Sequence, residues 1–130
     1  MKQLLTISLF TLVILTACKK DKGSASPSLK GLWTIENYVT KEYMSGVLTN
    51  TYTDQGAGAT IDFQNDGNVV VSLPGSTPQT HPYTITADSK VEFGGDIYEI
   101  RNLTSSNVTL FIRYDYGAGD YDEESINLKR

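Results

Sequence analysis

The sequence predicts an all-β protein, a small eight-stranded antiparallel barrel of up-and-down connectivity with room for one extra strand. Apolar residues alternate with polar ones over short segments, turn residues separate the segments, and no convincing 3.6-residue periodicity is present. Antiparallel strands dispose of their edges by closing into a barrel or by splitting into a sandwich. Short links between consecutive segments favour the barrel.

Eight segments carry the alternation between residues 30 and 130, a length that holds one domain with one modest core. Their apolar pairs, in chain order, are Trp33/Ile35, Ile61/Phe63, Val69/Val71, Tyr83/Ile85, Val91/Phe93, Tyr98/Ile100, Val108/Leu110 and Ile126/Leu128. Residues 65–68, 87–89, 94–96, 105–107 and 116–120 supply the turns. The one long connection, residues 45–58, contains GVLTNTYT, which predicts either a ninth strand or a flap.

The first 17 residues have the layout of a secretory signal peptide. Lys2 precedes roughly a dozen mostly apolar residues that end in small ones. This run is shorter than the stretch of about 20 residues that a transmembrane helix needs. We therefore expect an exported chain.

Leu15-Thr16-Ala17-Cys18 resembles the lipobox of bacterial lipoproteins. The resemblance implies cleavage before Cys18 and attachment of acyl chains to it, so that the protein partners a membrane through this residue. Residues 18–29 then form the lipidated cysteine and a flexible linker, since GSASPS is typical of linkers. The other interpretation is a free thiol inside a signal peptide. Lysine rather than aspartate at residue 19 favours the outer membrane, and leaves open its periplasmic face or the cell surface.

Charge divides along the same boundary. Residues 19–22 hold three lysines and one aspartate, whereas residues 30–130 hold seven Lys or Arg against fourteen Asp or Glu. The basic linker suits an anionic membrane surface, and the acidic domain would be repelled by phosphates. Nucleic-acid binding is therefore not expected.

Six features of the domain resemble a known family. They are Gly31-x-Trp33, Phe63 before Asp66-Gly67, Tyr83-Thr84-Ile85, Tyr98-Glu99-Ile100, Leu128-Lys129 and the final Arg130. This pattern is similar to the lipocalin-like domain of Bacteroidetes outer-membrane lipoproteins. The resemblance implies an eight-stranded barrel over residues 30–130, in which Gly31, Trp33 and Arg130 are structural and Arg130 packs over Trp33. The T-D-Y motif of the kernel lipocalins is absent.

Candidate catalytic groups are scarce. His81 is the only histidine and lies between loop-breaking residues, while the only cysteine is Cys18. Asp62–Gly67 superficially resembles the opening of a calcium loop, but its twelfth position is Leu73 and a hairpin turn explains it better. We expect no enzyme activity, no metal and no cofactor.

A ligand site is predicted from the aromatic residues. Tyr83, Phe93, Tyr98 and Tyr114 fall on inward-facing positions, and Glu124 shares a strand face with Ile126 near the mouth. These residues suit a pocket, because tyrosine offers an apolar ring with a hydrogen-bonding tip. The alternatives are tyrosines that only fill the core, and an acidic turn whose register is shifted by a bulge.

Two functions follow from these residues. In the first, a lipid-anchored envelope protein holds a small apolar or amphipathic ligand in its barrel. In the second, the barrel is filled and the protein is an interaction module, an accessory subunit or inhibitor, that contacts an envelope protein through exposed tyrosines such as Tyr43, Tyr52 and Tyr116.

Overall fold

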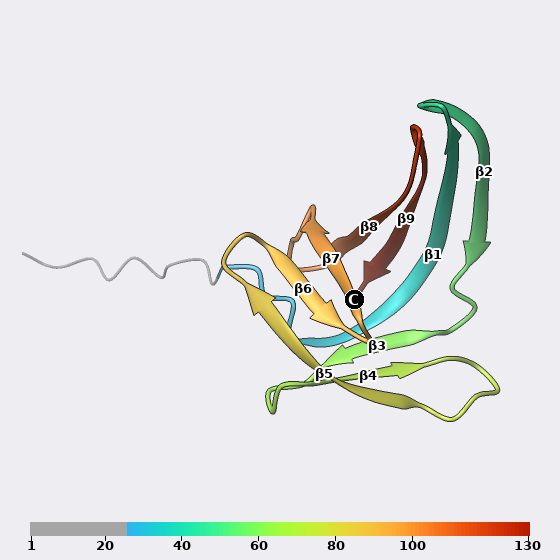
Figure 1. Cartoon of the computed structure of the whole chain (residues 1–130). Coiled ribbons are helices and arrows are strands. Elements are labelled where there is room, and N and C mark those ends of the chain that lie inside the picture. Colours follow the sequence, from blue (N-terminus) through green and yellow to red (C-terminus); the bar gives the residue numbers. More distant parts are fainter. Residues whose placement is uncertain (1–25) are drawn as a thin grey trace, which may run out of the picture.

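A computed structural model describes residues 26–130 and is all-β (Figure 1). The predicted signal peptide and the candidate lipidation site at Cys18 lie outside the described residues. Nine antiparallel strands form one sheet: β1 (Gly31–Met44), β2 (Val47–Gln55), β3 (Thr60–Phe63), β4 (Asn68–Ser72), β5 (Gln79–Thr86), β6 (Lys90–Phe93), β7 (Asp96–Arg101), β8 (Asn107–Gly117) and β9 (Asp120–Lys129).

Eight of these strands close a barrel. The order runs β1-β3-β4-β5-β6-β7-β8-β9, and β9 pairs back to β1. Tight turns make this possible: at the β3–β4 turn Gly67 has a φ of 86°, and the Asp66 carboxylate accepts a hydrogen bond from the Asn68 N–H at 3.0 Å. The structure therefore confirms the up-and-down barrel with one extra strand.

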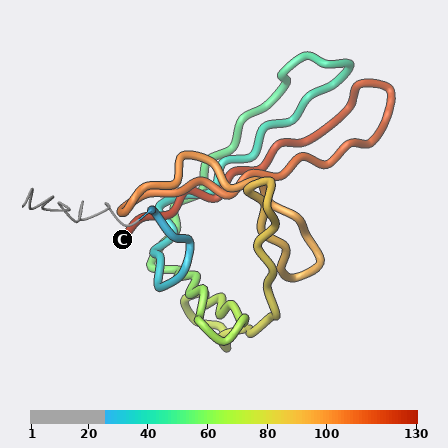
Figure 2. The backbone as a smooth tube through the Cα atoms, turned by 90° about the vertical axis from the view of Figure 1, so that its left-hand side faces the viewer, coloured from blue at the N-terminus to red at the C-terminus, as the bar shows by residue number. Residues whose placement is uncertain are grey.

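The extra strand is β2, which lies outside the ring. The first residues of β1 pair with β3, whereas residues 37–44 of the same edge pair with β2. Because β9 follows β1 along the other edge, the β1–β2 and β8–β9 hairpins rise together beyond the barrel (Figure 2). We call this part of the sheet, residues 37–55 and 112–125, the extension. Residues 45–58 therefore contribute a strand and not a flap.

Gly56 lies where the chain passes from β2 to β3. Its N–H donates to the Glu36 carbonyl at 2.9 Å, and the Ile35 N–H donates to the Ala59 carbonyl at 2.9 Å. A Cβ atom on Gly56 would lie 1.8 Å from the Ile35 carbonyl oxygen. Only glycine therefore lets the chain cross this close to β1.

Side chains fill the interior of the ring. The largest fully buried ones are Trp33, Phe63, Ile61, Leu110, Leu128, Val69, Val91 and Val108. The core residues come from β1, β3, β4, β6, β8 and β9, with Leu29 and Ala59 beside them. An eight-stranded ring is just wide enough for inward side chains to meet at its centre.

One end of the barrel is closed by both chain ends of the domain. The Trp33 indole N–H donates to the Leu29 carbonyl at 2.7 Å, and Leu29 is only 2 % exposed. Leu29, assigned to the linker from sequence, is thus part of the core. Arg130 lies over Trp33 on the outside, with its guanidinium carbon 3.9 Å from the ring centre.

Candidate functional site

Three of the predicted site residues pack together at the rim of the core. The rings of Phe93 and Tyr98 stack at 4.9 Å, and Phe63 meets Phe93 edge-on at 5.7 Å and Tyr83 at 5.2 Å. The Tyr83 hydroxyl donates to the Gln64 carbonyl at 2.9 Å. These rings therefore form the upper layer of the core and do not surround an open cavity.

The other two predicted residues, Tyr114 and Glu124, lie just above this layer. Tyr114 is opposite Asp122 on the inner side of the β8–β9 pair, and Glu124 follows on the same side. Asp96 joins them from β7, where it accepts a hydrogen bond from the Tyr98 hydroxyl at 3.5 Å. The structure thus brings Tyr98, Tyr114 and Glu124 together with two carboxylates, Asp96 and Asp122.

The strand register extends this group across the extension. Residues directly opposite each other share a face, so the inward rows of the barrel continue as one surface, which we call the inner face. Its positions are Tyr38, Thr40 and Glu42 on β1, Asn50, Tyr52 and Asp54 on β2, Ile112 and Tyr114 on β8, and Asp122 and Glu124 on β9. Four of these ten positions are carboxylates, three are tyrosines, and none is Lys, Arg or His.

The opposite face of the extension has a different chemistry. Arg113 lies over the Tyr121 ring with 3.5 Å between its guanidinium carbon and the ring centre, and Tyr121 stacks on Tyr43 at 4.3 Å. Lys41 is on this face too, opposite Glu123. The cations of the extension's paired strands are thus on the outer face, and the inner face carries uncompensated negative charge.

The pKa shifts have the signs expected for this charge. Burial raises the pKa of Glu124 above its ordinary value, and the neighbouring Asp122 and Asp96 raise it further. Burial also raises the pKa of the Tyr98 and Tyr114 hydroxyls, with Asp96 and Glu124 adding to both. Each group is therefore harder to ionise, as expected where surplus negative charge meets reduced solvation.

Hydrogen bonds hold the side chains of Tyr116 and Asn50 in place at this surface. The Tyr116 hydroxyl donates to Asp122 Oδ2 at 3.0 Å, and the Asn50 amide donates to Glu42 Oε2 at 2.7 Å. These bonds leave each carboxylate a second oxygen for another donor. The inner face therefore combines exposed tyrosine rings with carboxylates that can still accept hydrogen bonds.

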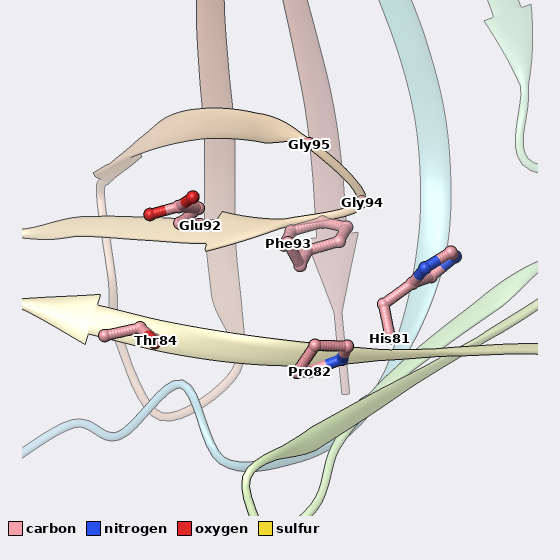
Figure 3. Close-up of a pocket in the computed structure, with 7 residues that line it drawn as sticks. All are labelled: His81, Pro82, Thr84, Glu92, Phe93, Gly94 and Gly95. Atoms are coloured by element: carbon pink, nitrogen blue, oxygen red, sulfur yellow. The ribbon is translucent and has the colours of Figure 1, made fainter.

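A notch of about 360 Å³ interrupts the barrel wall beside this surface (Figure 3). It lies where β6 has ended, so that His81 and Pro82 on β5 face Phe93, Gly94 and Gly95 at the β6–β7 turn. Of the residues that line the notch, only Phe93 belongs to the core. His81 stands here without a cysteine or second histidine beside it in the lining.

A second hollow, of about 320 Å³, lies at the closed end of the barrel. Its lining includes Leu29, Ile85, Ile100 and Leu103. Ile85 is 44 % exposed there, although its alternation predicts an inward position. Ile85 lines this hollow and is exposed through it, whereas Val91, directly opposite on β6, is completely buried.

Within residues 26–130 no group of three His, Cys, Asp or Glu side chains is arranged to hold a metal ion. The same residues include no helix of the length and apolarity needed to cross a membrane. In comparisons with known proteins, no family model matched the chain, and neither did any curated protein or solved structure.

The sequence predicted part of this surface and left the rest unpredicted. Tyr114 and Glu124 were predicted from alternation, but Glu42 and Asp54 were not. The alternation along β1 does not reveal Glu42, because a register shift between Ile35 and Asn37 moves the inward-facing residues of this strand from odd to even positions. Asp96 was read only as a turn residue.

Proposed function

We propose that this protein is a lipid-anchored binding protein of the cell envelope, whose ligand is amphipathic and cationic and binds the inner face of the extension. The carrying observation is the gathering of Tyr98, Tyr114 and Glu124 with Asp96 and Asp122 at the mouth of a filled barrel. A tyrosine ring attracts an ammonium group through its π-face, and a carboxylate accepts its hydrogen bonds.

The filled interior supports a site at the mouth in preference to one inside the ring. Trp33 and Leu110 are completely buried, and Phe93 with Tyr98 occupies the layer above them. A ligand that entered the ring would have to displace these side chains. A ligand on the inner face displaces only water, and its charge would relieve the repulsion among Glu124, Asp122 and Asp96.

The anchoring part of the proposal rests on the sequence. The lipobox-like Leu15–Cys18 and the basic residues that follow support attachment to a membrane, with the outer membrane favoured by Lys19. The eight-stranded barrel is consistent with the lipocalin-like family that the motifs resemble. The domain would then be held at a membrane surface with its acidic face directed toward a soluble ligand.

Binding is tested with two nearly isosteric probes, phenethylamine and phenethyl alcohol. With the full chain in detergent, we expect phenethylamine to shift the NMR signals of Tyr98, Tyr114 and their neighbours, and the alcohol to shift them at least tenfold more weakly. The double variant Asp122→Asn/Glu124→Gln should lose this preference, while Glu92→Gln, on the outer face of β6, should keep it. Equal affinity for both probes would refute a cation-selective site.

Anchoring is tested separately by growing an expressing bacterium with an alkyne-labelled fatty acid. The full chain should take up label and fractionate with membranes, whereas Cys18→Ser should do neither. Label on the Cys18→Ser chain would exclude this residue as the attachment site. This result is independent of the ligand experiment, since Cys18 and the inner face lie in different parts of the chain.

A further inference from the structure

Strand β2 leaves one of its two edges open. Among residues 26–130 it is hydrogen-bonded to β1 alone, because β3 continues the barrel below it. All nine residues of β2 are exposed. An edge of this kind presents a row of backbone donors and acceptors to any extended chain that approaches it.

The ladder indicates which backbone groups face outward. Gly56 donates to the Glu36 carbonyl where the β1–β2 ladder begins, and in antiparallel pairing every second residue faces the partner strand. The N–H and C=O of Tyr52 and Asp54 are therefore turned toward β1. Those of Thr51, Thr53 and Gln55 are turned to the open edge.

The sequence of β2 contains none of the usual blocks to strand addition. VLTNTYTDQ has no proline and no lysine, and its single charged residue is Asp54. Proteins commonly protect an edge strand with such residues. Instead, Val47 is 66 % exposed, Leu48 47 % and Tyr52 51 %, so the strand offers β-forming and apolar side chains to solvent.

Two hydrogen bonds within the chain hold the tip of the extension in place. The Ser45 N–H donates to Asp120 Oδ1 at 2.7 Å, and the Gly46 N–H donates to the Gly119 carbonyl at 2.7 Å. These two bonds join the β1–β2 turn to the β8–β9 turn. A partner strand would therefore meet an edge that is already ordered, which lowers the entropic cost of docking.

Charge selects the partner. On the inner face Asp54 lies on the edge strand itself, Glu42 lies one strand further in on β1, and Asp122 lies beyond it on β9; no basic residue lies at the inner-face positions. A second copy of this chain, paired through β2, would bring two such acidic faces side by side. A segment with Lys or Arg at alternate positions would place its cations over these carboxylates.

We propose that the open edge of β2 binds an extended, Lys- or Arg-bearing segment of a partner protein as a tenth strand of the sheet. Backbone hydrogen bonds to residues 51–55 supply the pairing, and the inner-face carboxylates select basic side chains on every second residue. The proposal stands on the open edge and its charge, and does not depend on the small cationic ligand.

The test measures binding of a ten-residue peptide of alternating lysine and threonine to the full chain in detergent, by fluorescence anisotropy. Two peptides serve as controls: one with glutamate for lysine, and one N-methylated on every residue, which removes every backbone donor whichever set faces β2. We expect both controls to bind at least tenfold more weakly. Equal binding of the N-methylated peptide would overturn strand pairing, and equal binding of the glutamate peptide would overturn selection by charge.

Protein variants separate the two parts of the mechanism. Thr53→Pro removes an outward N–H, so it should preserve the β1–β2 ladder and the melting temperature. It should nevertheless weaken binding of the lysine peptide at least tenfold, whereas Thr53→Ala should bind the peptide like the parent. Asp54→Asn/Glu42→Gln should weaken binding and reduce its salt dependence. Thr53→Pro should still bind phenethylamine, which distinguishes this edge from the site at the mouth. A dimer in sedimentation that Thr53→Pro dissociates would replace the basic partner with a second copy of the chain.

Discussion

The guanidinium of Arg130 lies 3.9 Å above the Trp33 ring, which joins the residue after the last strand to the first strand of the barrel. The same guanidinium donates to the carbonyls of Ser28, Lys30 and Ser105 at 2.8–2.9 Å. Gly31 makes room for it, since a Cβ atom there would lie 3.2 Å from Arg130 Nη1. Arg130 thus holds both ends of the domain over one buried ring.

Arg130→Ala should therefore lower the free energy of unfolding by about 2 kcal/mol, from the lost cation–π contact and the lost charged hydrogen bonds. Urea unfolding monitored by Trp33 fluorescence measures this loss of stability. In folded Arg130→Ala the emission should also shift to the red, as water reaches the ring. The matched control is Lys129→Ala, because among residues 26–130 the Lys129 ammonium pairs only with Glu36, at 3.5 Å, on the surface. A loss as large in Lys129→Ala would mean that the effect is one of net charge.

Gly56→Ala should be among the more damaging single-methyl additions in the domain. The new Cβ would lie 1.8 Å from the Ile35 carbonyl oxygen, so β1 and the β2–β3 link must separate. We expect a loss of about 3 kcal/mol in thermal or urea unfolding. Gly46→Ala is the control: its φ is +77°, but nothing lies within 4 Å, so it should cost only about 1 kcal/mol. Similar losses in both variants would argue against the close crossing.

Asp120→Ala should loosen the tip of the extension without unfolding the barrel. Asp120 Oδ1 accepts the Ser45 N–H at 2.7 Å, so its removal should speed hydrogen exchange at Ser45 and Gly46 at least tenfold. Global stability should change by no more than about 1 kcal/mol. Asp115→Ala, which loses the two hydrogen bonds from Arg113 on the outer face, should leave the exchange of these amides unchanged. Unchanged hydrogen exchange in Asp120→Ala would show that the two turns stay ordered without the Asp120 hydrogen bond.

Alternation predicted the barrel because most strands have one buried face. The rows at Trp33/Ile35, Ile61/Phe63 and Val108/Leu110 are inward in the structure, and the short turns between strands follow glycine and asparagine chemistry. Phe111 escaped this reasoning. It is 9 % exposed on the outer face, where the Arg101 guanidinium covers it with 3.3 Å between its carbon and the ring centre.

The position of β2 could not be predicted from its own residues. GVLTNTYT is equally compatible with a strand in the ring or beside it, and the outcome depends on β1 being long enough to pair with both β3 and β2 along one edge. Three of the ten inner-face positions depend on this arrangement, because Asn50, Tyr52 and Asp54 join the surface only through β2. Long-range pairing, not local propensity, placed these three residues there.

Glu124 should make the stability of the domain depend on pH in a particular direction. Its pKa is raised above the ordinary 4.5 by burial first, then by Asp122 and Asp96, so the folded state binds its proton more tightly than the unfolded chain does. Stability from this group is therefore greatest below pH 4.5 and declines as pH rises through the raised pKa. Glu124→Gln should be more stable than the parent at pH 7, and the difference should vanish as pH falls below 4.5.

Urea unfolding of both proteins between pH 3.5 and 8 measures this difference directly. Glu92→Gln, an exposed change on β6, should show no comparable trend. Adding phenethylamine at pH 7 should then narrow the gap between parent and Glu124→Gln, because a cation on the inner face stabilises the ionised carboxylate. A difference in free energy of unfolding that is independent of pH would mean that burial and neighbouring acids do not act on Glu124. A gap that the amine leaves unchanged would place the ligand away from this carboxylate.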